Sequence, residues 1–298
     1  MAGSPTFLPS TAEAVLDAAC RSAGLDSSGA TMMRVGENIL YRLSSTPVVV
    51  RIGRDAGHRP DACKELAVSG WLAAQGFPAA RVFEVDCPQP LDVGGHPVTF
   101  WRFLPGRPAT TDEAGVLGAL VRRLHQLPRP AIDLPPVRAF DHVAARLAVA
   151  PIAPADRELL HERVEVLSGQ LLAVEFALPE VALHGDAHIA NVMIDDGAPT
   201  LIDFEAFAWG PAEWDLAKTA AEASMGMVPD ADYRAFADAY GRDVTEWSGW
   251  PVLRGIQQLK MVSWLAQNVD HSSRIRAEYD KRIATIRTGV LTEPWRGL

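Results

Sequence analysis

The sequence has few cysteines. Only Cys20, Cys63 and Cys87 occur among 298 residues, with no Cys-x-x-Cys pair and no Cys/His cluster. This scarcity argues against a zinc site or a disulfide framework. The sequence also lacks an apolar run of 18 residues, so no membrane span is expected. No basic stretch opens the chain, and we therefore expect no secretory signal and a cytoplasmic location.

Basic residues are fewer than acidic residues. The chain carries 28 Lys+Arg against 37 Asp+Glu, a net charge of -9, which argues against a nucleic-acid partner because phosphate contacts need clustered Lys and Arg. The acidic excess is uneven: residues 1–105 have a net charge of -1 and residues 106–298 have -8. It can mean solvated helical surfaces, or an acidic cleft that attracts a cationic small molecule.

The first hundred residues alternate in the way strands do, and helical spacing occurs in two places. We expect helices at 11–23 and 61–75, and strands at 31–35, 39–43, 47–52, 81–85 and 97–103. Leu104-Pro105-Gly106 ends this pattern. Beyond it we expect helices at 111–126, 155–175, 213–223, 230–240, 249–268 and 273–289, with short strands at 181–183, 192–194 and 200–202.

These patterns predict an α+β chain of two parts. The first part is residues 1–104, of which 1–28 form an N-terminal helical extension, and the second is residues 105–298.

Polar residues that could take part in catalysis or bind a metal are concentrated between positions 184 and 215. Asp186 and Asn191 fall in a loop between two apolar strands, and Asp203 ends the next strand. Carboxylate and amide oxygens in such places suit Mg²⁺, which takes one or two carboxylates, phosphate oxygens and waters. The other interpretation is that His184, Asp186 and Asn191 only form turns and caps.

Protein kinases arrange the same residue types in the same order: a loop Asp beside the substrate hydroxyl, an Asn five residues later and a strand-end Asp, the last two for metal. His184-Gly185-Asp186 with Asn191 follows this arrangement, and Ile202-Asp203-Phe204 stands where Asp-Phe-Gly would.

The motifs His184 to Asn191, Ile202 to Glu205 and Asp215-Leu216-Ala217 resemble those of the aminoglycoside phosphotransferase family, small-molecule kinases with a protein-kinase-like fold. The resemblance covers residues 30–290. It implies a bilobal fold, with a small N-terminal lobe of a five-stranded antiparallel sheet plus a helix and a larger, mostly helical C-terminal lobe. It implies Asp186 as catalytic base, Asn191 and Asp203 as Mg²⁺ ligands, and structural roles for His184 and Asp215.

A kinase also needs a nucleotide site, with ATP or GTP as phosphoryl donor. Gly36 and Asn38 flank a turn that can lie over phosphates, and Arg51 stands where the family usually has Lys. Glu65, fourteen residues later, is the expected partner of Arg51, since either charge would be costly to bury alone. The backbone of the segment Arg102, Phe103 and Leu104 is expected to meet the adenine.

The acceptor is expected to be a small molecule with a hydroxyl group. Candidate substrate residues are His188, Glu205, Trp209, Trp264, Asn268 and Asp270. An aminoglycoside would need several carboxylates, whereas the eight tryptophans could line an apolar pocket for a macrolide or a nucleoside-like antibiotic.

The sequence therefore predicts an O-phosphotransferase that acts on an antibiotic of aminoglycoside or related type, as a monomer or homodimer. The alternatives are a kinase of a metabolite resembling choline, homoserine or a sugar, a nucleotide-binding pseudokinase, and a metal-dependent hydrolase using His184, Asp186, His188 and Asp203.

Overall fold

The fold was analysed in a computed structural model, which describes residues 9–36, 38–140 and 142–297. Glu37 of the predicted turn and residues 1–8 of the predicted extension lie outside these ranges. The chain forms two compact units. Unit 1 runs up to Pro108 and includes Pro130–Asp133 and Asn191–Phe207, whereas unit 2 consists of Ala109–Arg129, Leu134–Ala190 and Ala208–Leu298.

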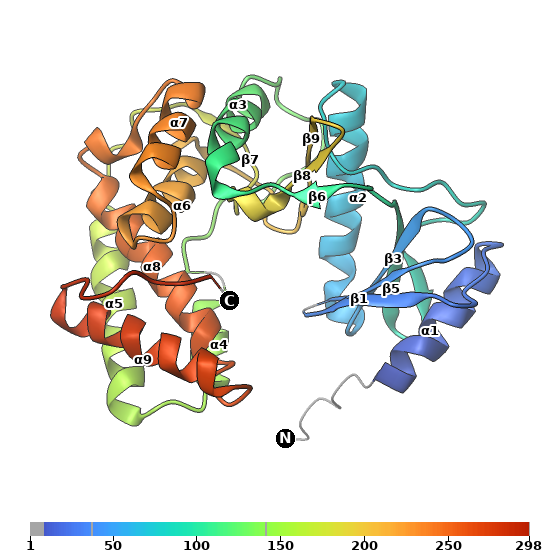
Figure 1. The fold of residues 1–298 in the computed structure, drawn as a ribbon, viewed down its shortest axis with the longest axis horizontal. Coiled ribbons are helices and arrows are strands. Elements are labelled where there is room, and N and C mark those ends of the chain that lie inside the picture. Colours follow the sequence, from blue (N-terminus) through green and yellow to red (C-terminus); the bar gives the residue numbers. More distant parts are fainter. Residues whose placement is uncertain (1–8, 37, 141, 298) are drawn as a thin grey trace. The chain divides into compact units, whose positions relative to one another are not determined.

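Unit 1 is built on a five-stranded antiparallel sheet with the strand order β1-β2-β3-β5-β4. Its strands are β1 (Thr31–Val35), β2 (Asn38–Arg42), β3 (Val48–Gly53), β4 (Leu91–Val93) and β5 (His96–Arg102). The helices α1 (Pro9–Ser22) and α2 (Arg59–Ala74) lie on opposite faces of it (Figure 1). Side chains alternate along β3, so Val48, Val50 and Ile52 pack with α1 and Arg51 faces α2.

The strand predicted at 81–85 is wrong, and β4 takes its place in the sheet. Two segments pair with the same edge of β5. Its first half pairs with β4, and its second half meets residues 81–83 through a single bridge between Val82 and Trp101. Between them, the side-chain oxygen of Gln89 accepts a hydrogen bond from the Phe100 amide (2.8 Å). The edge of β5 is too short for two full strands, so residues 81–85 stay extended without becoming one.

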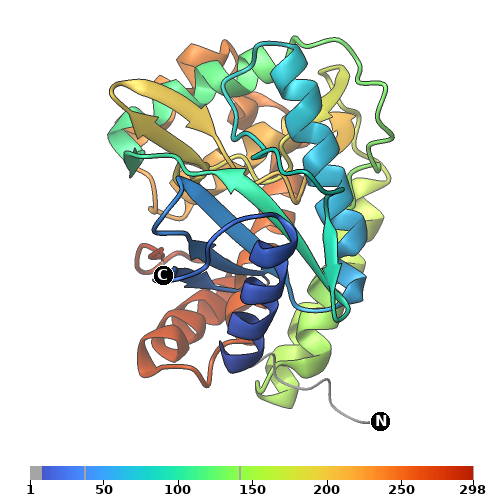
Figure 2. The same ribbon diagram turned by 90° about the vertical axis from the view of Figure 1, so that its right-hand side faces the viewer.

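A small second sheet belongs to unit 1 and has the order β6-β8-β9. It consists of β6 (Arg107–Pro108), β8 (Val192–Asp195) and β9 (Ala198–Leu201), and it is green-blue and yellow in Figure 2. Gly106 precedes β6 with a φ of 104°, and a Cβ there would lie 2.3 Å from the carbonyl oxygen of Ile194. This contact explains why glycine follows Pro105, a point the sequence left as a simple break.

Unit 2 is mostly helical. Its helices are α3 (Ala114–His125), α4 (Val143–Val149), α5 (Pro154–Leu171), α6 (Glu213–Ser224), α7 (Asp230–Tyr240), α8 (Trp250–Ala266) and α9 (Ser273–Thr288). The strands β7 (Glu180–Leu183) and β10 (Ala208–Pro211) pair antiparallel. α8 is buried along most of its length and packs against α4, α5, α6 and α9 (Figure 1).

Short 3₁₀ helices complete the chain at η1 (Ala56–His58), η2 (Thr111–Glu113), η3 (Ile189–Asn191) and η4 (Val244–Glu246). The predicted fold class is confirmed, whereas β6, β10 and α4 were not predicted. Within the described ranges, no helix has the length and apolar character needed to cross a membrane.

Candidate active site

The segment His184-Gly185-Asp186 follows β7 in unit 2 and is fixed by a buried carboxylate. Asp215, in the first turn of α6, accepts hydrogen bonds from the backbone amides of His184 (2.7 Å) and Gly185 (2.7 Å). It also pairs with His125 Nε2 at 3.0 Å, and His125 Nδ1 lies 2.9 Å from the Tyr240 hydroxyl. Gly185 has a φ of 81°, which glycine adopts without strain. The loop is therefore fixed through its backbone, and its position does not depend on the Asp186 side chain.

Two basic side chains contact the Asp186 carboxylate within unit 2. Lys218 Nζ, on α6, lies 3.0 Å from Oδ1, and His188 Nε2 lies 3.4 Å from Oδ2. Burial alone would raise the pKa of Asp186, but Lys218 and His188 hold this pKa well below its usual range. Asp186 is consequently ionised at neutral pH and can accept a hydrogen bond from a hydroxyl group.

Sequence reasoning missed Lys218. It follows Asp215 by three residues, so both side chains lie on one face of α6. Glu222, one turn later, lies 3.7 Å from its ammonium group. Burial opposes the charge, yet Asp186 and Glu222 raise the pKa of Lys218. A single lysine in a helix of buried apolar and small residues was the available signal, because a half-buried lysine needs a carboxylate partner.

The two predicted metal ligands lie in unit 1, at the same end of one hairpin. Asn191 directly precedes β8, and Asp203 comes two residues after β9. The Ile202 amide donates to the Asn191 carbonyl (2.9 Å), which joins the two segments. Asp203 has a φ of 67°, a left-handed conformation that Asp tolerates better than most residues. An amide oxygen and a carboxylate are ligand types that Mg²⁺ takes in proteins together with phosphate oxygens and waters, so these two residues fit this metal.

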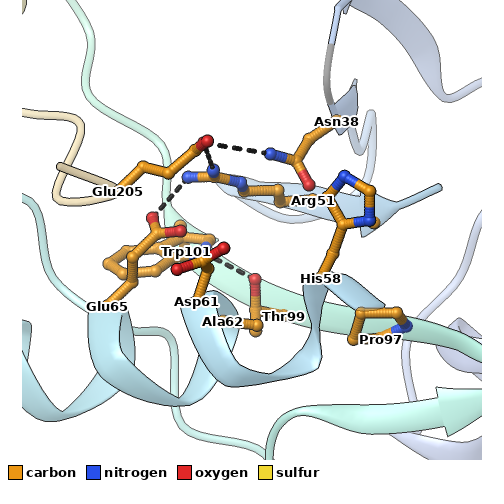
Figure 3. Close-up of a pocket in the computed structure, with 11 residues that line it drawn as sticks. Asn38, Arg51, His58, Asp61, Ala62, Glu65, Pro97, Thr99, Trp101 and Glu205 are labelled. Carbon is orange, nitrogen blue, oxygen red and sulfur yellow. Dashed lines mark hydrogen bonds and ion pairs between the residues drawn. The ribbon is translucent and has the colours of Figure 1, made fainter. Parts of the chain in front are cut away.

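A pocket in unit 1 surrounds Arg51, and Figure 3 shows its guanidinium between two carboxylates. Nη1 forms an ion pair with Glu65 of α2, and Nη2 lies 2.8 Å from Glu205 Oε2. The Asn38 amide donates to the same Glu205 oxygen at 3.4 Å; turned by 180°, its own oxygen would accept from Arg51 Nη2 at 2.7 Å. Lys64 donates to the Glu205 carbonyl. The structure thus brings four residues of the sequence analysis together here: Asn38, Arg51, Glu65 and Glu205.

The burial of this cluster shifts two pKa values. Glu65 is 3% exposed, and burial raises the pKa of its carboxyl to about 7 against the opposing charge of Arg51. Burial would lower the pKa of Arg51, but Glu65, Asp203 and Glu205 together raise it. The guanidinium is a fixed positive charge whose carboxylate neighbours include the predicted metal ligand Asp203.

The predicted adenine-binding segment ends β5. The backbone amides of Arg102 and Phe103 already donate to the carbonyl oxygens of Arg81 (2.8 Å) and Pro47 (2.8 Å). The amide of Leu104 donates to no carbonyl among the residues that the structure describes. Of the three backbone amides in this predicted segment, only that of Leu104 has no carbonyl partner among the described residues and is left to donate to a base. Gly36 directly follows β1, the strand at the opposite edge of the sheet from β4. Its carbonyl oxygen accepts a hydrogen bond from Arg54 Nε (2.8 Å).

The predicted substrate residues do not form one group. Glu205 belongs to the Arg51 cluster of unit 1, whereas the others lie in unit 2. Trp209 lines an apolar cavity of about 320 Å³ near the start of β7, the end remote from Asp186. Trp264 is 40% exposed on α8, and its carbonyl accepts from the Asn268 side chain (2.8 Å). Asp270 is exposed and ion-paired with Arg276 at 2.6 Å.

Comparison with known proteins assigns the chain to a family. A family model described as the phosphotransferase enzyme family (APH) matches residues 37–256, most of the chain and all of the motifs above. The chain belongs to this phosphotransferase enzyme family. It is thus a small-molecule phosphotransferase, and the resemblance inferred from its motifs is confirmed. A search of curated proteins gave no match.

Solved structures share the fold of this phosphotransferase at low sequence identity. An amicoumacin kinase in complex with AMP-PNP, Ca²⁺ and "Ami" has a TM-score of 0.74 at 14% identity, covering 95% of this chain and 97% of that one. A choline/ethanolamine kinase family protein from Mesorhizobium loti has a TM-score of 0.63 at 18% identity, with 96% and 95% covered. An aminoglycoside phosphotransferase from Streptomyces rimosus has 0.62 at 22%, with 85% and 98% covered. The phosphotransferase therefore has the protein-kinase-like fold of small-molecule kinases.

Proposed function

We propose that this phosphotransferase moves the γ-phosphoryl group of ATP to a hydroxyl group of a small molecule. The observation that carries the proposal is the ionised Asp186, held in a loop whose backbone Asp215 fixes and whose carboxylate Lys218 and His188 contact. Phosphoryl transfer needs little from the protein besides positioning and charge, and a preorganised acceptor for the hydroxyl proton meets the first need. Solved structures of the same fold contain AMP-PNP or AMP, which supports a nucleotide donor.

Asp186 accepts a hydrogen bond from the acceptor hydroxyl, orients its oxygen toward the phosphorus and takes its proton as the bond forms. Lys218 keeps Asp186 ionised before the transfer. Its ammonium group, with three donors, can also contact oxygen atoms of the phosphoryl group during its transfer.

Unit 1 supplies the nucleotide side. Asn191 and Asp203 would hold Mg²⁺, which when bound neutralises charge on the phosphates. Arg51, freed from one of its two carboxylates, would donate to phosphate oxygens bidentately, and Glu65 would keep its position. The Leu104 amide would donate to the base.

We expect Asp186→Asn to lower kcat by roughly 10²- to 10⁴-fold, the usual contribution of a general base, with unchanged nucleotide affinity. Turnover is measured as ADP release with an acceptor panel of aminoglycosides, macrolides, choline, homoserine and sugars. Asp238→Asn, an exposed change on α7 in the same unit, is the matched control. A near wild-type rate in Asp186→Asn would remove Asp186 from the mechanism. Nucleotide binding without turnover of any acceptor would favour a pseudokinase.

A further inference from the structure

Lys260 is a half-buried cation on α8, a helix that is otherwise largely apolar and buried. Among the described residues, no carboxylate lies within ion-pair distance of its ammonium group. Burial of a charge without a partner is costly, and lysines in such places are normally paired. Within the part of the chain that the structure describes, Lys260 therefore lacks an ion-pair partner, and a negatively charged ligand group could supply one.

Lys260 lies close enough to Asp186 to interact with it electrostatically, and two further cations lie near its ammonium group. Lys218 of α6 and Arg146 of α4 both repel it, and α8 packs against each of these helices. Burial is the main reason that the pKa of Lys260 is lowered; Asp186 and, more weakly, Asp215 raise this pKa, and Lys218 and Arg146 lower it. Asp186 itself is engaged by Lys218 and His188. Lys218 of α6 and Lys260 of α8 thus both bring positive charge to the loop that carries the proposed base.

Carboxylates of unit 2 that could attract a polycation already form ion pairs within the chain. Asp270 pairs with Arg276 at 2.6 Å, and Glu278 pairs with both Lys281 (2.7 Å) and Arg282 (2.8 Å). Glu222 is 3.7 Å from Lys218. These three described carboxylates of residues 106–298 are therefore engaged in ion pairs rather than free to bind a polycation. The charge near Asp186 fits an acceptor with a negative group better than a polycationic one.

We propose that the acceptor is a hydroxy compound with a carboxylate, which binds Lys260 while its hydroxyl group meets Asp186. This rests on the proposed phosphotransferase function and narrows it to a substrate class. Trp264 follows Lys260 by four residues, so it lies on the same face of α8 one turn further along. Its half-exposed indole can pack against the apolar part of such an acceptor. In the reaction the γ-phosphoryl group replaces the hydroxyl proton, Asp186 accepts that proton, and ADP leaves.

The test uses acceptors in pairs that differ only in the negative group: homoserine and homoserinol, glycerate and glycerol, pantothenate and pantothenol. Choline and an aminoglycoside serve as cationic probes. We expect ADP release with at least one carboxylate-bearing member, at a kcat/KM at least tenfold above that of its uncharged partner.

Lys260→Met should raise the KM for that acceptor roughly 10- to 100-fold, the usual effect of losing a hydrogen bond between charged groups, with the KM for ATP unchanged. Lys260→Arg should restore part of the affinity. Arg254→Met, which removes an exposed cation from the same helix, is the matched control and should change neither constant.

The inference is overturned if only cationic or uncharged acceptors are phosphorylated, if no carboxylate-bearing acceptor is, or if Lys260→Met raises the KM for ATP alone. The last result would place Lys260 on the phosphates. None of these outcomes contradicts the proposed phosphotransferase function. That function is contradicted by a different result, namely phosphorylation of an accepted compound that does not depend on Asp186.

Discussion

At the residue scale, the activity proposed here depends on one charge balance. Asp186 must be ionised to accept a proton, but its carboxylate is partly withdrawn from water. Lys218 compensates for this, and its own charge is stabilised by Asp186 and Glu222. Lys218 is therefore a positioning residue for Asp186, a role that a merely structural lysine would not have.

Replacing Lys218 should move the pH dependence of the reaction. In Lys218→Met the pKa of Asp186 rises, because the ammonium group, which lowers this pKa more than His188 or Lys260 does, no longer offsets the effect of burial. Since the rate requires ionised Asp186, the acidic limb of the kcat/KM profile should shift to higher pH.

The measurement is the profile of ADP release between pH 4 and 8 with an accepted compound, where the position of the limb is independent of the amount of folded enzyme. Lys281→Met, which removes a lysine paired with Glu278 on α9, is the control and should leave the limb in place. A limb that stays in place in Lys218→Met would assign Lys218 a purely structural role.

At the scale of elements, α2 is tied to the sheet of unit 1 through buried charge. Glu65 and Arg51 pair across α2 and β3, and Glu205 joins Arg51 from the turn after β9. Breaking a buried pair by removing one member is costly because the other charge is left without a partner. The same burial makes Glu65 bind a proton more readily in the folded than in the unfolded chain.

Glu65→Gln should therefore change how stability depends on pH. The folded pKa of about 7 lies above the ordinary value of 4.5, so Glu65 stabilises the fold most below pH 4.5, and this contribution is lost as pH rises to 7. The free energy of unfolding of wild type minus that of Glu65→Gln should fall over this window. Denaturant unfolding at several pH values measures it, with Glu84→Gln, an exposed change in unit 1, as control. A difference that does not vary with pH would contradict the raised pKa.

Elements with strong local patterns were predictable, and those defined by their partners were not. The helices α6 to α9 and the strands β1 to β3 appear within a few residues of their predicted bounds, because periodicity and end signals are local. Residues 81–85 have the composition of a strand, yet the edge of β5 is divided between them and β4. β6 has only two residues and exists because β8 lies beside it.

The candidate site shows the same division at the scale of the whole molecule. Asp186, Asn191 and Asp203 were predictable since their spacing is a kinase motif. Lys218, Lys260 and His125 belong to no sequence motif. The packing of α6, α8 and α3 in unit 2 brings them near the loop that carries Asp186. Net charge was a poor guide for a related reason: ion pairs within the fold decide which carboxylates stay available.

Binding of Mg²⁺ and nucleotide should stabilise the whole molecule, because a ligand bound only by the folded state adds about 2.7 kcal/mol at a hundredfold excess over Kd. We expect AMP-PNP with Mg²⁺ to raise Tm more than AMP-PNP with EDTA, and Asp203→Asn to abolish this metal-dependent part. Asn tolerates the left-handed backbone of Asp203, so the substitution removes the charge without straining the turn. Asp196→Asn is the matched control, since Asp196 is also left-handed, with a φ of 49°, and lies in the same hairpin. If Asp203→Asn retained the full metal-dependent rise, Asp203 would not be a metal ligand, and the nucleotide side proposed for unit 1 would need another carboxylate.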